Sequence, residues 1–183
     1  MNDIERWLKE SARIKNEVAE TESANIEAAA MRIAQALREG KRIYLMGNGG
    51  SAADAQHIAG ELINRFLLDR GPLPAIALTT DTSVLTSVAN DYGFTEIFSK
   101  QVAALVTEGD IAWGFSTSGT SPNVVAALRL AREMGAVTVG LTGRTGGEIK
   151  QYCDYCVLVP SNITPWIQEA HISIGHAICD VIE

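Results

Sequence analysis

Hydroxyl side chains are concentrated in one short segment, residues 116–121, where five of six residues are serine or threonine. An apolar run precedes this segment, and Ser121 with Pro122 is typical of a helix start, with serine as the cap and proline at the first helical position. Free backbone N–H groups at that start, together with the hydroxyls of Ser116, Ser118 and Ser121, would suit a phosphate dianion. The alternative interpretation is an ordinary polar turn with one capping serine.

A second loop, residues 47–51 with the sequence Gly-Asn-Gly-Gly-Ser, also joins an apolar run to a helical segment. With Ala52 it formally matches a dinucleotide-binding fingerprint. Dinucleotide binding needs an acidic residue at the end of the second strand, about twenty positions after the glycine-rich loop, and Asp81 lies too far along the chain for that role. We therefore expect these glycines to admit a smaller ligand close to the backbone, with Ser51 as a further donor.

Titratable residues at helical spacing could add chemistry to these loops. His57 and Glu61 are four residues apart and share one helix face, which suits a solvated surface and a functional site about equally. In the last helical segment, Gln168 and His176 lie two turns apart on a similar face, and His171 points well away from His176. Spacing alone does not decide which of these two histidines is functional.

The elements that must position these residues alternate along the chain. Residues 2–39 predict two helices, the second with apolar residues at helical spacing. Beyond them we expect strands at 42–46, 75–78, 111–115, 136–141 and 156–159, and helices at 51–66, 82–106 (one or two), 122–134, near 147 and at 165–182. This order predicts an α/β fold with a five-stranded parallel sheet covered by helices on both faces. Ligands of such folds bind at the carboxyl edge of the sheet.

Length and composition limit the function classes. A chain of 183 residues with 46% hydrophobic content predicts a single domain, 1–183. The net charge is −7 and the basic residues are dispersed, so we expect no nucleic-acid partner. No segment has the roughly twenty apolar residues of a membrane span, and the charged first ten residues lack a signal core, so we expect a cytoplasmic protein. Of three cysteines, Cys153 and Cys156 form a C-x-x-C in a strand-like run. We expect these two to serve as small apolar side chains rather than as a metal-binding or redox pair.

Taken together, five motifs in this order resemble the phosphoheptose isomerase family. They are Gly-Asn-Gly-Gly-Ser (47–51), His57-x-x-x-Glu61, Ala-Asn-Asp-Tyr-Gly-Phe (89–94), Ser-Thr-Ser-Gly-x-Ser (116–121) and Ile-Gln-Glu-x-His (167–171). The resemblance runs nearly from end to end. It implies the flavodoxin-like SIS fold, a homotetramer, and conversion of sedoheptulose 7-phosphate to D-glycero-D-manno-heptose 7-phosphate in heptose biosynthesis for lipopolysaccharide or capsule. The apolar stripe of residues 1–39 needs covering, so we expect these residues to lie in subunit interfaces.

The same resemblance implies roles for particular residues. The substrate-binding residues would be Asn48, Gly49, Gly50, Ser51, Glu61, Asn90, Asp91, Ser116, Thr117, Ser118, Ser121 and Gln168, with Ser51, Ser116, Ser118 and Ser121 on the phosphate and Asn48, Asp91 and Thr117 on sugar hydroxyls. One zinc ion per subunit would be held by His57, Glu61, Gln168 and His176, a ligand set that suits this metal. Glu61 would be the catalytic base, and His176 would either move protons between sugar oxygens or hold zinc.

Two observations keep alternatives open. The family commonly has an arginine just before the Ile-Gln-Glu segment, whereas Pro165 and Trp166 stand here, so substrate preference or a subunit contact could differ. A non-catalytic SIS protein that binds the bacterial replication initiator is the alternative function. In that group the final histidine is replaced and the Ser-Thr-Ser loop altered, whereas this chain retains His176, Ser118 and Ser121, which favours the enzyme. A sugar-phosphate-sensing regulator would use the same phosphate loop without needing the histidines.

Overall fold

A computed structural model describes residues 2–183, so Met1 of the expected 1–183 domain lies outside the described residues. The chain forms one parallel sheet with the strand order β2-β1-β3-β4-β5, which confirms the predicted α/β class. The strands are β1 (Ile43–Gly47), β2 (Ala75–Ala77), β3 (Ile111–Ser116), β4 (Val137–Gly143) and β5 (Tyr155–Val159). The helices are α1 (Asp3–Arg38), α2 (Gly50–Ile63), α3 (Thr82–Tyr92), α4 (Ser99–Leu105), α5 (Pro122–Glu133) and α6 (Thr164–Ile182), with 3-10 turns η1 (Phe94–Glu96) and η2 (Ile149–Tyr152).

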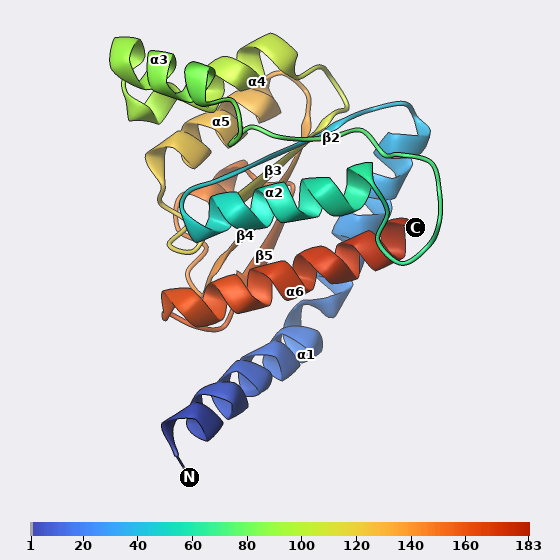
Figure 1. Cartoon of the computed structure of the whole chain (residues 1–183), viewed down its shortest axis with the longest axis vertical. Helices are drawn as coiled ribbons and strands as arrows, with labels where there is room; N and C mark the ends of the chain where they lie inside the picture. Colours follow the sequence, from blue (N-terminus) through green and yellow to red (C-terminus); the bar gives the residue numbers. More distant parts are fainter. Residues whose placement is uncertain (1) are drawn as a thin grey trace.

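The N-terminal segment is one continuous helix, not the predicted pair. α1 runs unbroken for 36 residues, capped at its start by the Asn2 side chain, which accepts from the Glu5 backbone N–H at 2.8 Å. No glycine or proline interrupts residues 3–38, so nothing in the backbone ends the helix before Gly40, which has a φ of 77°. Its first turns extend beyond the rest of the molecule in Figure 1.

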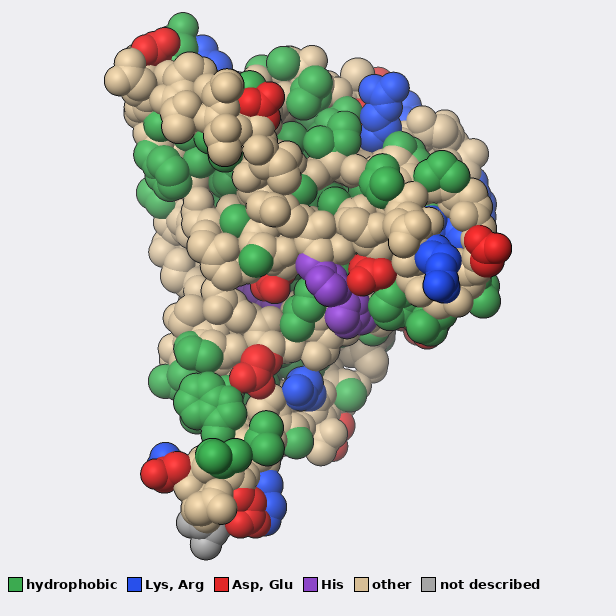
Figure 2. All heavy atoms as spheres, in the orientation of Figure 1, with side chains coloured by type: hydrophobic (Ala, Val, Ile, Leu, Met, Phe, Trp, Pro, Cys, Tyr) green, Lys and Arg blue, Asp and Glu red, His purple; other side chains and the backbone are tan. Residues whose placement is uncertain are grey.

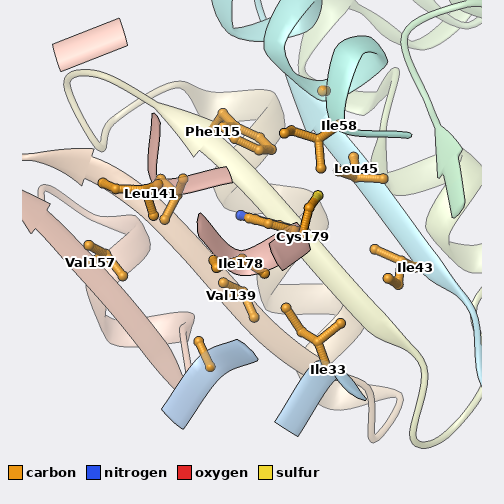
Figure 3. Close-up of a cluster of buried hydrophobic side chains, with 14 of the residues drawn as sticks. Ile33, Ile43, Leu45, Ile58, Phe115, Val139, Leu141, Val157, Ile178 and Cys179 are labelled. Carbon is orange, nitrogen blue, oxygen red and sulfur yellow. The ribbon is translucent and has the colours of Figure 1, made fainter. Parts of the chain in front are cut away.

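Helices cover both faces of the sheet, as predicted (Figure 1). On β1, Ile43 and Leu45 face the core shared with α1, α2 and α6, whereas Tyr44 and Met46 face the core shared with α4, α5 and η2. All five residues of β1 are buried, as expected for a strand enclosed on two sides. Figure 3 shows the first core, where Ile33, Ile58, Ile178 and Cys179 surround the sheet side chains Leu45, Phe115 and Val139.

The strand order creates a switch point between β1 and β3. After β1 the chain moves outward to β2 and then returns to β3 on the opposite side of β1. The loops that follow β1 and β3 therefore lead to opposite faces, α2 to one and α5 to the other. Such a switch point is the place where open parallel sheets bind ligands.

Within residues 2–183, no helix combines the length and the hydropathy that a bilayer crossing requires.

Candidate functional site

Two helices begin side by side at the switch point without side-chain caps. α2 follows β1 with Gly49 at its N-cap, at a φ of 57°, and α5 follows β3 with Ser121 at its N-cap and Pro122 in its first turn. No side chain at either N-cap position bonds a helix N–H; Ser121 Oγ instead lies 3.0 Å from Ser116 Oγ. In the first turns, the N–H groups of Ser51, Ala52 and Val124 already have acceptors within these two segments. Among the described residues, the N–H groups of Gly50 and Asn123 are left for an anion at this edge of the sheet.

The predicted phosphate-binding serines line this place at different depths. Ser51 and Ser116 are only 3% and 2% exposed, at the first turn of α2 and the end of β3. Ser118 is exposed and accepts hydrogen bonds from the backbone N–H and the hydroxyl of Thr120 at 3.2 and 3.0 Å. Ser51 and Ser116 are therefore shielded from solvent and Ser118 is open to it, and contact of these serines with a phosphate stays a prediction.

An amide pair that the sequence did not reveal joins the two loops. Asn48 donates to Asn123 Oδ1 at 2.9 Å, and Asn123 donates back to Asn48 Oδ1 at 2.8 Å. Asn123 is 1% exposed and also accepts from the Val124 N–H at 3.0 Å. The pair fixes the spacing of the two helix starts. Asn123 was missed because it is one polar residue in a helical stretch, 75 positions from its partner.

The structure brings His57, Glu61 and His176 together from two helices. His57 Nε2 lies 3.1 Å from Glu61 Oε1 on α2, which confirms their common face, and 2.8 Å from His176 Nε2 on α6. The ligand atoms of all three lie within 4.8 Å of one another. In Figure 2 the histidine side chains gather in the middle of the visible face, beside acidic side chains. His176, rather than His171, is therefore the histidine at the site.

These three residues fit a zinc ion by their chemistry and spacing. Tetrahedral zinc with bonds of about 2.0–2.1 Å separates neighbouring ligand atoms by about 3.3 Å. The two separations from His57 Nε2, 2.8 and 3.1 Å, would have to widen by about 0.2–0.5 Å to match, and all three ligand atoms lie within 4.8 Å of one another. Two imidazoles and a carboxylate are also ligands that zinc prefers.

Gln168 reaches the first residue of α2, Gly50, from the first turns of α6. A Cβ atom placed on Gly50 would lie 2.6 Å from Gln168 Nε2. One of the glycines that we expected to admit a ligand thus makes room for a side chain of the protein itself. Gly49, in contrast, has open space where its side chain would be, which is compatible with a ligand there.

Two further groups surround this cluster. Asp54 lies one turn before His57 on α2, and burial raises the pKa of its carboxyl to about 6 although His57 opposes the shift. Its buried Oδ2 has no hydrogen-bond partner among the described residues. On the other side, the ring of Phe66 stacks on the His176 ring, with centroids 5.3 Å apart and planes 24° apart. Phe66 was predicted only as the end of a helix, and no spacing rule links it to His176.

His171 is a buried structural residue. It is fully buried on α6, and its ring meets Phe115 edge-on at 6.3 Å between centroids. Burial lowers its pKa to about 4, although the nearby Thr142 backbone carbonyl opposes the shift. Neither ring nitrogen makes a well-formed hydrogen bond within residues 2–183. The ring is thus held neutral in the core.

Other predicted residues lie apart from the cluster. Asn90 and Asp91 are exposed on α3, where the Asn90 amide donates to Asp91 Oδ1 at 2.8 Å. Across residues 2–183 no hydrogen bond joins this pair to another predicted site residue, so their contact with substrate stays a prediction. Thr117 is half-buried between Ser116 and Ser118, and its carbonyl accepts from the Gly143 N–H at 3.0 Å.

Trp166, just before Ile167, contacts the N-terminal helix. The ring of Trp166 packs on Trp7 of α1, with centroids 5.0 Å apart, and Trp7 Nε1 donates to Glu169 Oε1 at 3.2 Å. Ser11 also donates to Glu169. Trp166 therefore forms an aromatic contact between α1 and α6. α6 begins at Thr164 with a proline in its first turn, a position that tolerates proline.

Fold and site together define a class of protein. The parallel sheet is covered on both faces, and its switch point presents two helix starts without a side-chain N-cap and a hydroxyl-rich loop. Such a site is suited to phosphorylated sugars. Residues 6–143 match the family model of the SIS domain.

Comparison with known proteins narrows this class. The phosphoheptose isomerase of Aquifex aeolicus is 50% identical over 183 residues, covering 100% of this chain and 96% of that protein. The solved phosphoheptose isomerase from Neisseria gonorrhoeae has a TM-score of 0.92 and 44% identity, covering 98% of this chain and 96% of that one. The one from Francisella tularensis has a TM-score of 0.94 and 38% identity, covering 100% and 98%. The chain belongs to the phosphoheptose isomerase family, as its motifs predicted.

Proposed function

We propose that this protein is an aldose–ketose isomerase that converts sedoheptulose 7-phosphate to D-glycero-D-manno-heptose 7-phosphate. The observation that carries the proposal is the position of Glu61, a half-buried carboxylate beside two imidazoles on a chain whose loops are built to hold a phosphate. The reaction moves a carbonyl between neighbouring carbons, and it therefore needs one base, one route for hydroxyl protons and one anchor for the phosphate.

Glu61 acts as the base in this mechanism. It removes the proton from C1 of the open-chain ketose, which leaves a cis-enediol, and it returns a proton to C2 from the same side of the sugar. His57 Nε2, 3.1 Å from Glu61 Oε1, orients the carboxylate. Base catalysis by one positioned carboxylate typically contributes about 10²–10⁴-fold to the rate.

In this mechanism, His176 moves protons between the sugar oxygens. While C1 loses its proton to Glu61, the hydroxyl proton on O1 must leave and O2 must gain one. An imidazole can both accept and donate a proton at such oxygens near neutral pH. The stacked Phe66 ring limits how far the His176 ring can turn.

The phosphate is the anchor. Ser51, Ser116, Ser118 and Ser121 with the N–H groups of α2 and α5 hold it, and the pairing of Asn48 with Asn123 sets the distance between the two helices. Binding energy from this remote group positions the reacting carbons against Glu61.

Zinc would be held by His57, Glu61 and His176, with Gln168 as the fourth ligand suggested by family resemblance. When bound, the ion would polarise the carbonyl oxygen and stabilise negative charge that develops on it. Because a carboxylate bound to a cation is a weaker base, the metal dependence of the rate bears directly on the role of Glu61.

We further propose a homotetramer that works in the cytoplasm. An apolar groove of about 410 Å³ runs between α1 and α6, lined by Val18, Ile26, Ile174, Ala177 and Val181 among others, and a second copy of the chain would cover it. α3 has no buried residue in the single chain, which also favours coverage by another subunit. The three cysteines are free thiols, which fits a reducing compartment.

The test is conversion of sedoheptulose 7-phosphate by the purified protein, with and without added zinc. Glu61→Gln and His176→Ala are compared with Glu133→Gln, which makes the same change as the first variant on an exposed position of α5. We expect turnover in the wild type and in Glu133→Gln, and its loss in Glu61→Gln. An inactive wild type that still binds the sugar phosphate would overturn the proposal in favour of a binding protein.

A further inference from the structure

The segment after α2 lies against the cluster of His57, Glu61 and His176, yet most of its own side chains are exposed. Residues 64–70 have no regular structure beyond the helix end, and Leu67 and Leu68 are 63% and 56% exposed. Phe66, between them and the helix, is the residue that stacks on His176. Something other than side-chain burial must therefore fix this segment.

A single carboxylate binds the backbone of this segment. Glu183 accepts from three consecutive N–H groups, those of Phe66, Leu67 and Leu68, each at 2.8 Å. Consecutive N–H groups pointing at one anion form a compact, charge-assisted site. The Glu183 side chain is 2% exposed, so water does not compete for these donors.

Arg70 completes the arrangement and ties it to the base. Its guanidinium Nε lies 3.0 Å from Glu183 Oε1, and its side chain is 16% exposed. The same guanidinium donates to the backbone carbonyl oxygens of Leu62 at 2.7 Å and Glu61 at 3.0 Å. These carbonyls end α2 and lack helical partners, so Arg70 caps the turn from which the Glu61 side chain projects.

Glu183 lies two turns beyond His176 on the same helical run. One stretch of chain therefore supplies both His176 and the anchor of the segment that packs against it. A displacement of this segment would move the Phe66 ring from His176 and loosen the last turn of α2 together.

We propose that Glu183 is a positioning residue of the isomerase. It acts through Arg70 and the backbone of residues 66–68 to hold the side chains of His176 and Glu61 at their positions in the cluster. This inference rests on the proposed function, since it assigns both residues to the reaction. The phosphate loops make no hydrogen bond or ion pair with Glu183 or Arg70 among the described residues, so we expect phosphate binding to be independent of this anchor.

The experiment compares Glu183→Gln with Asp180→Asn, which neutralises an exposed carboxylate three residues earlier. Turnover of sedoheptulose 7-phosphate and backbone hydrogen exchange of residues 66–68 are measured for both variants and the wild type. We expect kcat of Glu183→Gln to fall by about 10- to 100-fold with KM within about twofold, because a misplaced catalytic group slows chemistry without weakening the phosphate anchor. Amide exchange at residues 66–68 should speed up in this variant alone.

A second variant, Phe66→Leu, removes the stacked ring and leaves the three backbone hydrogen bonds in place. It should lower kcat without faster amide exchange, and it keeps the inference testable if Glu183→Gln folds poorly. Wild-type kcat in Glu183→Gln, or a fall in kcat that Asp180→Asn shares, would overturn the positioning role while leaving the isomerase intact. A wild type without turnover would refute the proposed function and this role with it.

Discussion

The buried His171 should make this protein lose stability in mild acid. Its pKa is about 4 in the folded chain, against an ordinary value of 6.5, because burial disfavours the charged ring. Between these two values the unfolded chain binds a proton that the folded chain does not. Stability therefore falls as the pH drops from about 6.5 to 4, and above that window the histidine contributes no pH dependence.

The size of the effect follows from the separation of the two pKa values. At about 1.4 kcal/mol per pH unit, the separation corresponds to about 3 kcal/mol when fully expressed below pH 4. At pH 5 the unfolded histidine is almost fully protonated and the folded one mostly neutral, so about 2 kcal/mol of the free energy of unfolding is lost relative to pH 7. This is a large fraction of a typical folding free energy of about 5–15 kcal/mol.

The assay is urea denaturation at pH 7 and pH 5, at one fixed protein concentration because subunit association would also contribute to stability. His171→Leu removes the titrating ring, and His171→Phe keeps a ring shape against Phe115. Other acidic groups titrate alike in all three proteins, so the comparison isolates His171. We expect the wild type to lose about 2 kcal/mol more than either variant.

The variants should be close to wild-type stability at pH 7, because the ring nitrogens lack well-formed hydrogen bonds that a replacement would break. If wild type and both variants lose the same stability between pH 7 and pH 5, His171 is not a buried neutral ring and the reasoning fails.

Three further perturbations test the site. Gly50→Ala would place a Cβ 2.6 Å from the Gln168 amide, so we expect the amide to be displaced and kcat/KM to fall at least tenfold in a steady-state assay; unchanged kinetics would show that Gln168 adjusts freely. His57→Ala should lower the zinc content of the purified protein after dialysis, as read by atomic absorption, and retention at the wild-type level would exclude His57 as a ligand. Asn123→Ala leaves the Asn48 amide without its partner and should cost about 1–3 kcal/mol in urea unfolding, together with a higher KM; a loss below about 0.5 kcal/mol would contradict the bridging role.

The sequence by itself determined the class of fold and located the two loops for which phosphate binding is proposed. Both depend on local patterns: apolar runs of strand length between amphipathic helices, and a Ser-Pro helix start after a hydroxyl-rich turn. Within a helix, spacing also sufficed, because four residues bring His57 and Glu61 to one face whatever surrounds them. Local rules were less reliable where the chain had no breaker, and the predicted helical pair is the single helix α1.

Only the tertiary structure decided which groups meet across the chain. His57 and His176 are 119 residues apart, and spacing could not choose between His171 and His176 until the sheet placed one in the core and the other against α2. The Asn48–Asn123 pair and the binding of Glu183 to residues 66–68 likewise join distant segments. These contacts depend on the order of strands and the packing of α2 against α6, which arise from burial of the whole core and leave no periodic trace in the sequence around any one residue.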